Sequence, residues 1–154
     1  MTENWVGITV AGEKLVIVHA EVPDTGPLTI VIDRTIELAK GDRAKGYVTI
    51  HKQVADYLAE KKIGRAVIKE SALSLSGTKK SHLLSAELRG VVMCACASVC
   101  MTTQVSKAKV SKTFGDRKAD EYLSDNSFWD DSIEGQLRVG SREAVLNILA
   151  ARSK

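Results

Sequence analysis

This chain of 154 residues lacks the features that would place it in a membrane or in a secreted class. Its longest uncharged apolar stretch, residues 90–99, is shorter than the roughly 20 residues that a transmembrane helix needs. Its first residues have neither the basic start nor the apolar run of a secretory signal peptide. We therefore expect a cytoplasmic protein with no membrane partner.

Cysteine is also scarce, and its placement excludes a disulfide framework. Cys94, Cys96 and Cys100 are the only three, and all fall in one helix-like segment. An odd number so close together does not predict paired disulfides. Residues two apart on a helix point to nearly opposite sides, and no histidine lies nearby in the sequence, so a metal clip is disfavoured. We expect small buried thiols instead.

What is present is typical of one globular domain. Hydrophobic residues make up 44% of the chain and charged residues 27%, with no change in composition along its length. A chain of this size buries about 68–70% of its unfolded surface, which provides a core without disulfides or structural metals. We expect a single domain spanning residues 1–154.

The net charge of +3 is small, but the charges are segregated. Residues 107–118 carry five basic side chains and one acid, whereas residues 119–137 carry six acids and no lysine or arginine. Such a surface can steer a polyanion toward one side of the molecule. Two oppositely charged solvated faces would give the same pattern.

The hydrophobic periodicity changes along the chain. Residues 6–10, 14–22 and 28–32 are β-rich runs separated by turn residues, which predicts three antiparallel strands. Apolar residues then recur every three or four positions up to about residue 62, which predicts an amphipathic helix. Further elements are expected at residues 65–70 (strand), 81–99 (helix), 99–105 (strand), 117–123 (helix capped by Asp116) and after Ser141 (helix). The helix-separated strands predict parallel pairing, so the fold class is α/β.

Four short motifs follow one another in this framework. Residues 7–12 (Gly-Ile-Thr-Val-Ala-Gly) form a glycine turn, Glu70 closes the fourth strand, residues 88–91 (Leu-Arg-Gly-Val) lie in the next helix, and residues 107–121 are rich in lysine before a glycine turn. Together they resemble the RuvC-type Holliday-junction resolvases of the ribonuclease H-like superfamily. The resemblance implies a mixed sheet, with three antiparallel strands followed by parallel strands, and helices on both faces.

The resemblance also implies where acids should stand. Phosphodiester hydrolysis with two metals needs clustered carboxylates that hold both ions. The first-strand aspartate of the family maps to Thr9, whose neutral hydroxyl is a poor substitute. The family's last helix carries paired aspartates, where this chain has Glu143 and Asn147. Only Glu70 is an acid at its expected place.

Basic residues are the stronger candidates for binding. On an extended segment Lys107 and Lys109 would point the same way, as phosphate contacts require, with Lys112 close by. Lys79 and Lys80, in the loop after Glu70, would extend this surface toward DNA or RNA. The resemblance also implies a homodimer through the second helix, where Gly90 and the small residues Ala95, Cys96 and Ala97 would allow close approach.

We interpret the chain as a RuvC-like domain with a depleted metal site that binds nucleic acid or a partner without catalysis. One alternative is an active Mg²⁺- or Mn²⁺-dependent endonuclease in which Glu70 is joined by Glu143 or by Asp125, Asp130 or Asp131. The other is a protein–protein interaction module with no affinity for nucleic acid. Without metal, no cofactor is expected.

Overall fold

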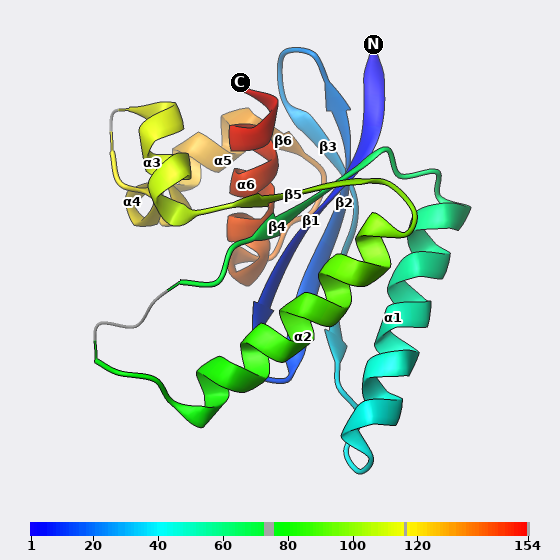
Figure 1. Cartoon of the computed structure of the whole chain (residues 1–154). Helices are drawn as coiled ribbons and strands as arrows, with labels where there is room; N and C mark the ends of the chain where they lie inside the picture. The colour runs from blue at the N-terminus through cyan, green and yellow to red at the C-terminus, as the bar shows by residue number, and fades with distance from the viewer. Residues whose placement is uncertain (73–75, 116, 154) are drawn as a thin grey trace.

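The structure, a computed structural model, describes residues 1–72, 76–115 and 117–153. Three long strands open the chain, and helices then alternate with short strands (Figure 1). The elements are β1 (Thr2–Ala11), β2 (Lys14–Pro23), β3 (Leu28–Glu37), α1 (Arg43–Glu60), β4 (Arg65–Lys69), α2 (Lys80–Ala97), β5 (Met101–Val105), α3 (Lys107–Phe114), α4 (Ala119–Leu123), α5 (Asn126–Ser132), β6 (Ile133–Glu134), the 3-10 helix η1 (Val139–Ser141) and α6 (Arg142–Arg152).

The strands form one mixed sheet in the order β5-β4-β1-β2-β3-β6. β1, β2 and β3 are antiparallel neighbours, whereas β4 pairs parallel with β1, and β5 pairs parallel with β4. The predicted fold class is therefore confirmed. The short strand β6, which lies parallel to the start of β3, was not predicted. Because β1, β4 and β5 run parallel, their C-terminal ends lie at the same end of the sheet.

Helices cover both faces of this sheet. α1 and α2 lie side by side on one face, and the shorter helices α3, α4 and α5 gather with α6 on the other (Figure 1). Successive side chains of β1 point to opposite faces of the sheet, so this strand contributes to the core under each layer of helices. Val6 and Ile8 are fully buried in the core under α1 and α2, whereas Trp5 belongs to the core under α6.

Gly7 fixes how closely α6 approaches the sheet. A Cβ atom at this position would lie 2.2 Å from the carbonyl oxygen of Ala144 and 3.0 Å from Cδ1 of Ile148. No side chain fits there, so α6 rests directly on the backbone of β1. This contact brings the first turn of α6 beside the C-terminal half of β1.

Several expectations about the second half of the chain were wrong. Lys107 and Lys109 lie at the start of helix α3 and not on an extended segment, so they point to nearly opposite sides. Residues 126–132, for which no element was predicted, form helix α5. Helix α4 begins at Ala119 with Lys118 in the N-cap position, and Asp116, the expected cap, lies outside the described residues.

The second helix also differs from expectation at its packing surface. Ala95 and Cys96 are fully buried against the sheet, so they cannot supply a contact with another chain. Burial raises the pKa of the Cys96 thiol to about 12, as expected of a small core residue. Cys94 is exposed, so the expectation of a buried thiol was wrong there. Gly90 and Ala97 remain exposed.

Candidate functional site

The candidate site lies where β1, β4 and the start of α6 meet. Thr9 on β1 belongs to the face that α6 covers, and Lys69 is the last residue of β4. Glu143 lies in the first turn of α6. The Lys69 ammonium donates a hydrogen bond to Oε1 of Glu143 over 3.0 Å, and the two side chains are only 28% and 25% exposed. A lysine therefore holds the one acid that α6 brings to this site.

A second ion pair lies next to the first. Nζ of Lys107, in the first turn of α3, lies 2.8 Å from Oδ1 of Asp120 on α4. The hydrogen bond from Lys107 lowers the pKa of Asp120, and the charge of Lys69 contributes to the same shift. The same bond raises the pKa of Lys107, with a contribution from Glu143. The four side chains thus form one group of alternating charge.

Glu70 does not belong to this group. It follows β4 directly, and because side chains alternate along a strand it points away from the face of Lys69. Glu70 is exposed and borders a neighbouring hollow with Ser85 and Arg89 of α2. This hollow shares Lys69 with the one that Glu143 lines, but Glu70 and Glu143 do not line the same hollow.

The other acids considered as partners of Glu70 in a metal site do not join it. Asp125 forms an ion pair with Arg117 over 2.9 Å and accepts the hydrogen bond that caps α5. Asp130 and Asp131 are exposed on α5. Across the described parts of the chain, no three histidine, cysteine or acidic side chains are grouped so that they could hold a metal ion.

Asn147 lies one helical turn beyond Glu143, but it is buried in the core with only 3% of its surface exposed. Its Nδ2 atom has no hydrogen-bond partner among the described residues. It is not among the residues that line the hollow formed by Thr9, Lys69 and Glu143. Asn147 therefore does not join Glu143 in a shared site.

The lysines predicted to contact nucleic acid differ in their availability. Lys107 is paired with Asp120, whereas Lys109 and Lys112 are exposed on α3 and lie three positions apart, on neighbouring parts of the helix surface. Lys79 and Lys80 are exposed at the start of α2. α3 and the start of α2 follow β5 and β4 respectively, so both lysine groups lie beyond the same edge of the sheet.

Sequence reasoning missed a polar cluster that joins β3 to the start of α6. Asp33 accepts hydrogen bonds from the backbone and the guanidinium of Arg138, both over 2.8 Å, and from the hydroxyl of Ser141. Ser141 stands at the N-cap of α6, as expected, but its hydroxyl binds Asp33 and not the helix. Burial alone would raise the pKa of Asp33, but these hydrogen bonds lower it.

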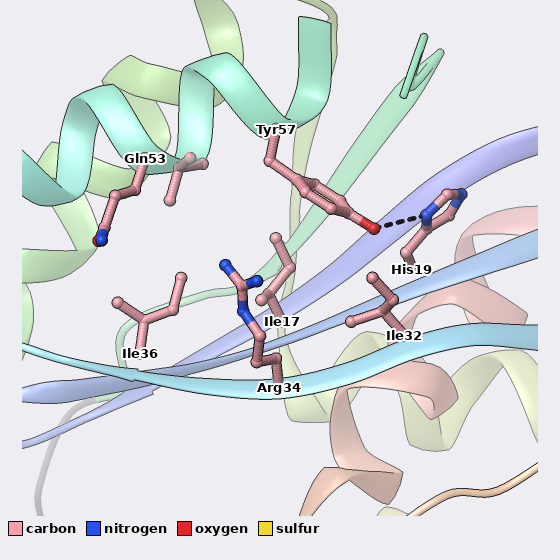
Figure 2. Close-up of a pocket in the computed structure, with 8 residues that line it drawn as sticks. Ile17, His19, Ile32, Arg34, Ile36, Gln53 and Tyr57 are labelled. Carbon is pink, nitrogen blue, oxygen red and sulfur yellow. Dashed lines mark hydrogen bonds between the residues drawn. The ribbon is translucent and has the colours of Figure 1, made fainter. Parts of the chain in front are cut away.

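A smaller hollow lies on the other face of the sheet, beside α1. Figure 2 shows His19 and Tyr57 pointing toward each other, with Arg34 and three isoleucines around them. Nδ1 of His19 lies 2.8 Å from the Tyr57 hydroxyl, and its Nε2 lies 2.9 Å from Oδ1 of Asn4. Burial lowers the pKa of His19. With both ring nitrogens in hydrogen bonds, this histidine serves the packing of α1 on the sheet.

Strand order, helix placement and the parallel pairing of β1, β4 and β5 together define a ribonuclease H-like fold of the RuvC type. No protein-family model and no curated protein sequence matches the chain. No helix in the described residues is both long and apolar enough to cross a bilayer.

Solved structures of Holliday-junction resolvases share this fold. T. thermophilus RuvC in complex with a Holliday junction substrate matches with a TM-score of 0.73 and 10% identity, covering 98% of this chain and 93% of that one. A second structure of Thermus thermophilus RuvC matches with a TM-score of 0.73, 12% identity and coverage of 97% and 93%. The yeast mitochondrial Holliday junction resolvase Ydc2 matches with a TM-score of 0.66 and 9% identity, covering 98% of this chain and 79% of that one. At such low identity these likenesses concern the fold alone.

Proposed function

We propose that this chain is a RuvC-like domain that binds nucleic acid without cleaving it. The observation that carries the proposal is the hydrogen bond between Lys69 and Glu143. It lies at the end of β1, where the family resemblance places a cluster of carboxylates. A cationic side chain occupies the space beside the one carboxylate that α6 provides.

These residues do not fit a pair of divalent cations. Two-metal hydrolysis needs several negative oxygens around ions about 4 Å apart. Here Thr9 contributes a neutral hydroxyl, and Glu143 is already bonded to an ammonium. At an effective dielectric constant of 20, an ammonium about 4 Å from a divalent cation repels it by about 8 kcal/mol, which offsets the attraction of one carboxylate at the same distance. The Lys69–Glu143 pair therefore provides no net negative charge to hold a cation.

Affinity for nucleic acid is the function we retain. The exposed lysines of α3, Lys109 and Lys112, have no acidic partner among the described residues. Phosphate contacts of this kind bind DNA or RNA without reading the sequence. RuvC of T. thermophilus, which has the same fold, was solved with a Holliday junction substrate. This likeness supports branched DNA as the first ligand to test.

We retain the homodimer as part of the proposal, with a revised surface. An open hollow of about 630 Å³ between α1 and α2 is lined by Val48, Gly90, Val91 and Cys94, among others. Val48 is 70% exposed, and a Cβ atom built on Gly90 meets no atom within 4 Å. A second copy would cover these apolar groups. Light scattering of the wild type and of Val48→Asp tests this: a dimer that becomes a monomer is expected, and a wild-type monomer would contradict it.

A binding and cleavage assay tests the proposed function. Labelled branched DNA, and RNA of the same sequence, are titrated with protein in EDTA and then in Mg²⁺ or Mn²⁺. We expect salt-sensitive binding without cleavage. The double variant Lys109→Ala with Lys112→Ala should reduce the slope of log affinity against log salt by about 2. The matched control is Lys45→Ala with Lys61→Ala, which removes the same charge from exposed positions at the two ends of α1.

The other outcomes favour the alternatives. Metal-dependent cleavage that is lost in Glu70→Ala would support an active nuclease with a rearranged set of acids. No binding of any nucleic acid at low salt would support a protein-interaction module.

A further inference from the structure

On the same face of the sheet as α6, the part that the helix does not cover contains an open hollow of about 410 Å³. It extends across the C-terminal half of β1, the start of β2 and the end of β3, and the segment leading into α6 closes one side. Three basic side chains, Lys14, Lys69 and Arg138, line it together with one carboxylate, Glu143. The charge is thus the reverse of that in an acidic metal site.

Two of these three basic side chains form ion pairs with acids, and the third does not. Lys69 is bonded to Glu143, and Arg138 is bonded to Asp33. Lys14 has no ion pair or side-chain hydrogen bond among the residues that the structure describes. Its ammonium is therefore free to bind an anion, while the other two cations are held in place by their acids.

Hydroxyl groups line the floor of the same hollow. Thr9, Val16 and Thr35 are direct cross-strand neighbours on β1, β2 and β3, so their side chains stand in one row on one face. In the described residues neither threonine hydroxyl has a hydrogen-bond partner. Two free donors thus stand in the same hollow as a free ammonium.

The approach to α6 adds a weaker contribution. Gly140 and Ser141 border the hollow just before the helix begins, and no side chain caps the first turn of α6. Backbone N–H groups at such a helix start favour an anion. Glu143, in the same turn, opposes this effect, but its charge is offset by Lys69.

We infer that this hollow binds a phosphate group directly, through Lys14, Thr9 and Thr35, without a divalent cation. The inference rests on the proposed function only for the identity of the ligand, a phosphodiester of a nucleic-acid backbone. The chemistry of the site would serve a free phosphate equally well. The site where the family resemblance predicts bound cations would thus have become a site for the anion itself.

One carboxylate limits the affinity. Glu37 is the cross-strand neighbour of Lys14 and is exposed on the same face of the sheet. A negative charge on a directly cross-strand residue competes with the phosphate for the ammonium of Lys14. Replacing Glu37 by glutamine should therefore strengthen binding, which gives the inference a test in the direction of increased affinity.

The test uses ¹⁵N-labelled protein in EDTA at constant ionic strength. Amide spectra are recorded during one titration with inorganic phosphate and another with a short single-stranded oligonucleotide. We expect the amides of Thr9, Thr35 and Gly140 to shift in both titrations. Lys14→Ala should weaken phosphate binding about threefold to tenfold, which corresponds to roughly 0.7–1.4 kcal/mol. Glu37→Gln should strengthen binding, and Lys45→Ala on α1 should leave it unchanged.

The outcomes separate this inference from the proposed function. Shifts with phosphate but none with the oligonucleotide would support a site for free phosphate and contradict the nucleic-acid function. Shifts with the oligonucleotide that are confined to α3, with Lys14→Ala equal to the wild type, would support the proposed function and overturn the inference. Absence of any shift with phosphate, in the wild type and in Glu37→Gln, would also overturn it.

Discussion

Replacing Gly7 by alanine should strongly destabilise the fold, because α6 rests on this residue. The added Cβ atom would lie 2.2 Å from the carbonyl oxygen of Ala144, whereas an ordinary contact needs about 3.5 Å. The helix must therefore move outward by about 1 Å. Eight consecutive residues of α6, from Ala144 to Ala151, are buried, so this movement disturbs the packing of a whole face of the sheet.

The size of the effect follows from that displacement. Overpacking of a well-packed core typically costs about 1–3 kcal/mol, and a clash with backbone at both partners belongs at the upper end. A loss of about 3 kcal/mol should lower the melting temperature by roughly 6–12 °C for a chain of this length.

Urea denaturation followed by circular dichroism measures the loss, and Gly64→Ala is the matched control. Gly64 lies outside the proposed dimer surface, and a Cβ atom there meets only the carbonyl oxygen of Asn4 at 3.8 Å, so this variant should be neutral or gain up to about 1 kcal/mol. If Gly7→Ala were as stable as the wild type, the close packing of α6 on β1 would be refuted.

Three further predictions concern stability and reactivity. Asp33→Asn should destabilise the protein by roughly 1.5–3 kcal/mol in urea denaturation, because the side chain is only 9% exposed and accepts three hydrogen bonds; a variant as stable as the wild type would contradict this anchoring role. The pKa of His19 is lowered by burial, so the unfolded chain binds the proton more readily and stability should fall as the pH drops below about 6.5. His19→Gln should remove part of that slope, and an identical slope in both proteins would count against the assignment. In thiol labelling at pH 8, exposed Cys94 should react quickly and Cys96, with its pKa of about 12, only after unfolding; rapid labelling of both would show that the core under α2 is open.

The first five strands of the sheet could be predicted from the sequence because local patterns of residues mark them. Alternating apolar residues and turn residues mark β1, β2 and β3, and the period of the apolar residues changes at α1. Helix α3 was missed although its ends are also marked. Ser106 accepts a hydrogen bond from the backbone of Lys109, and Gly115 ends the helix with a φ of 79°. A serine cap and a terminal glycine with eight residues between them would have predicted this helix.

The candidate site was harder to predict because its contacts are not local. Lys69 and Glu143 are 74 residues apart, and nothing in either segment indicates that they meet. Their contact depends on Gly7, which allows α6 to approach β1. Thr9 and Thr35 are different, because hairpin register alone would place them in one row across β2. Hydroxyl groups and a single lysine form no recognisable sequence motif, so the residues that line the hollow could be grouped only from this register.

Manganese binding is the most direct test of the proposal that this site does not hold a pair of divalent ions. Calorimetric titration of the purified chain with MnCl₂, repeated with Glu143→Gln and Glu70→Ala, measures it without any nucleic acid. We expect no saturable uptake below about 1 mM in any of the three proteins, because Lys69 neutralises Glu143 and Glu70 lies apart. Saturable binding of a pair of ions by the wild type, lost in Glu143→Gln, would contradict the account.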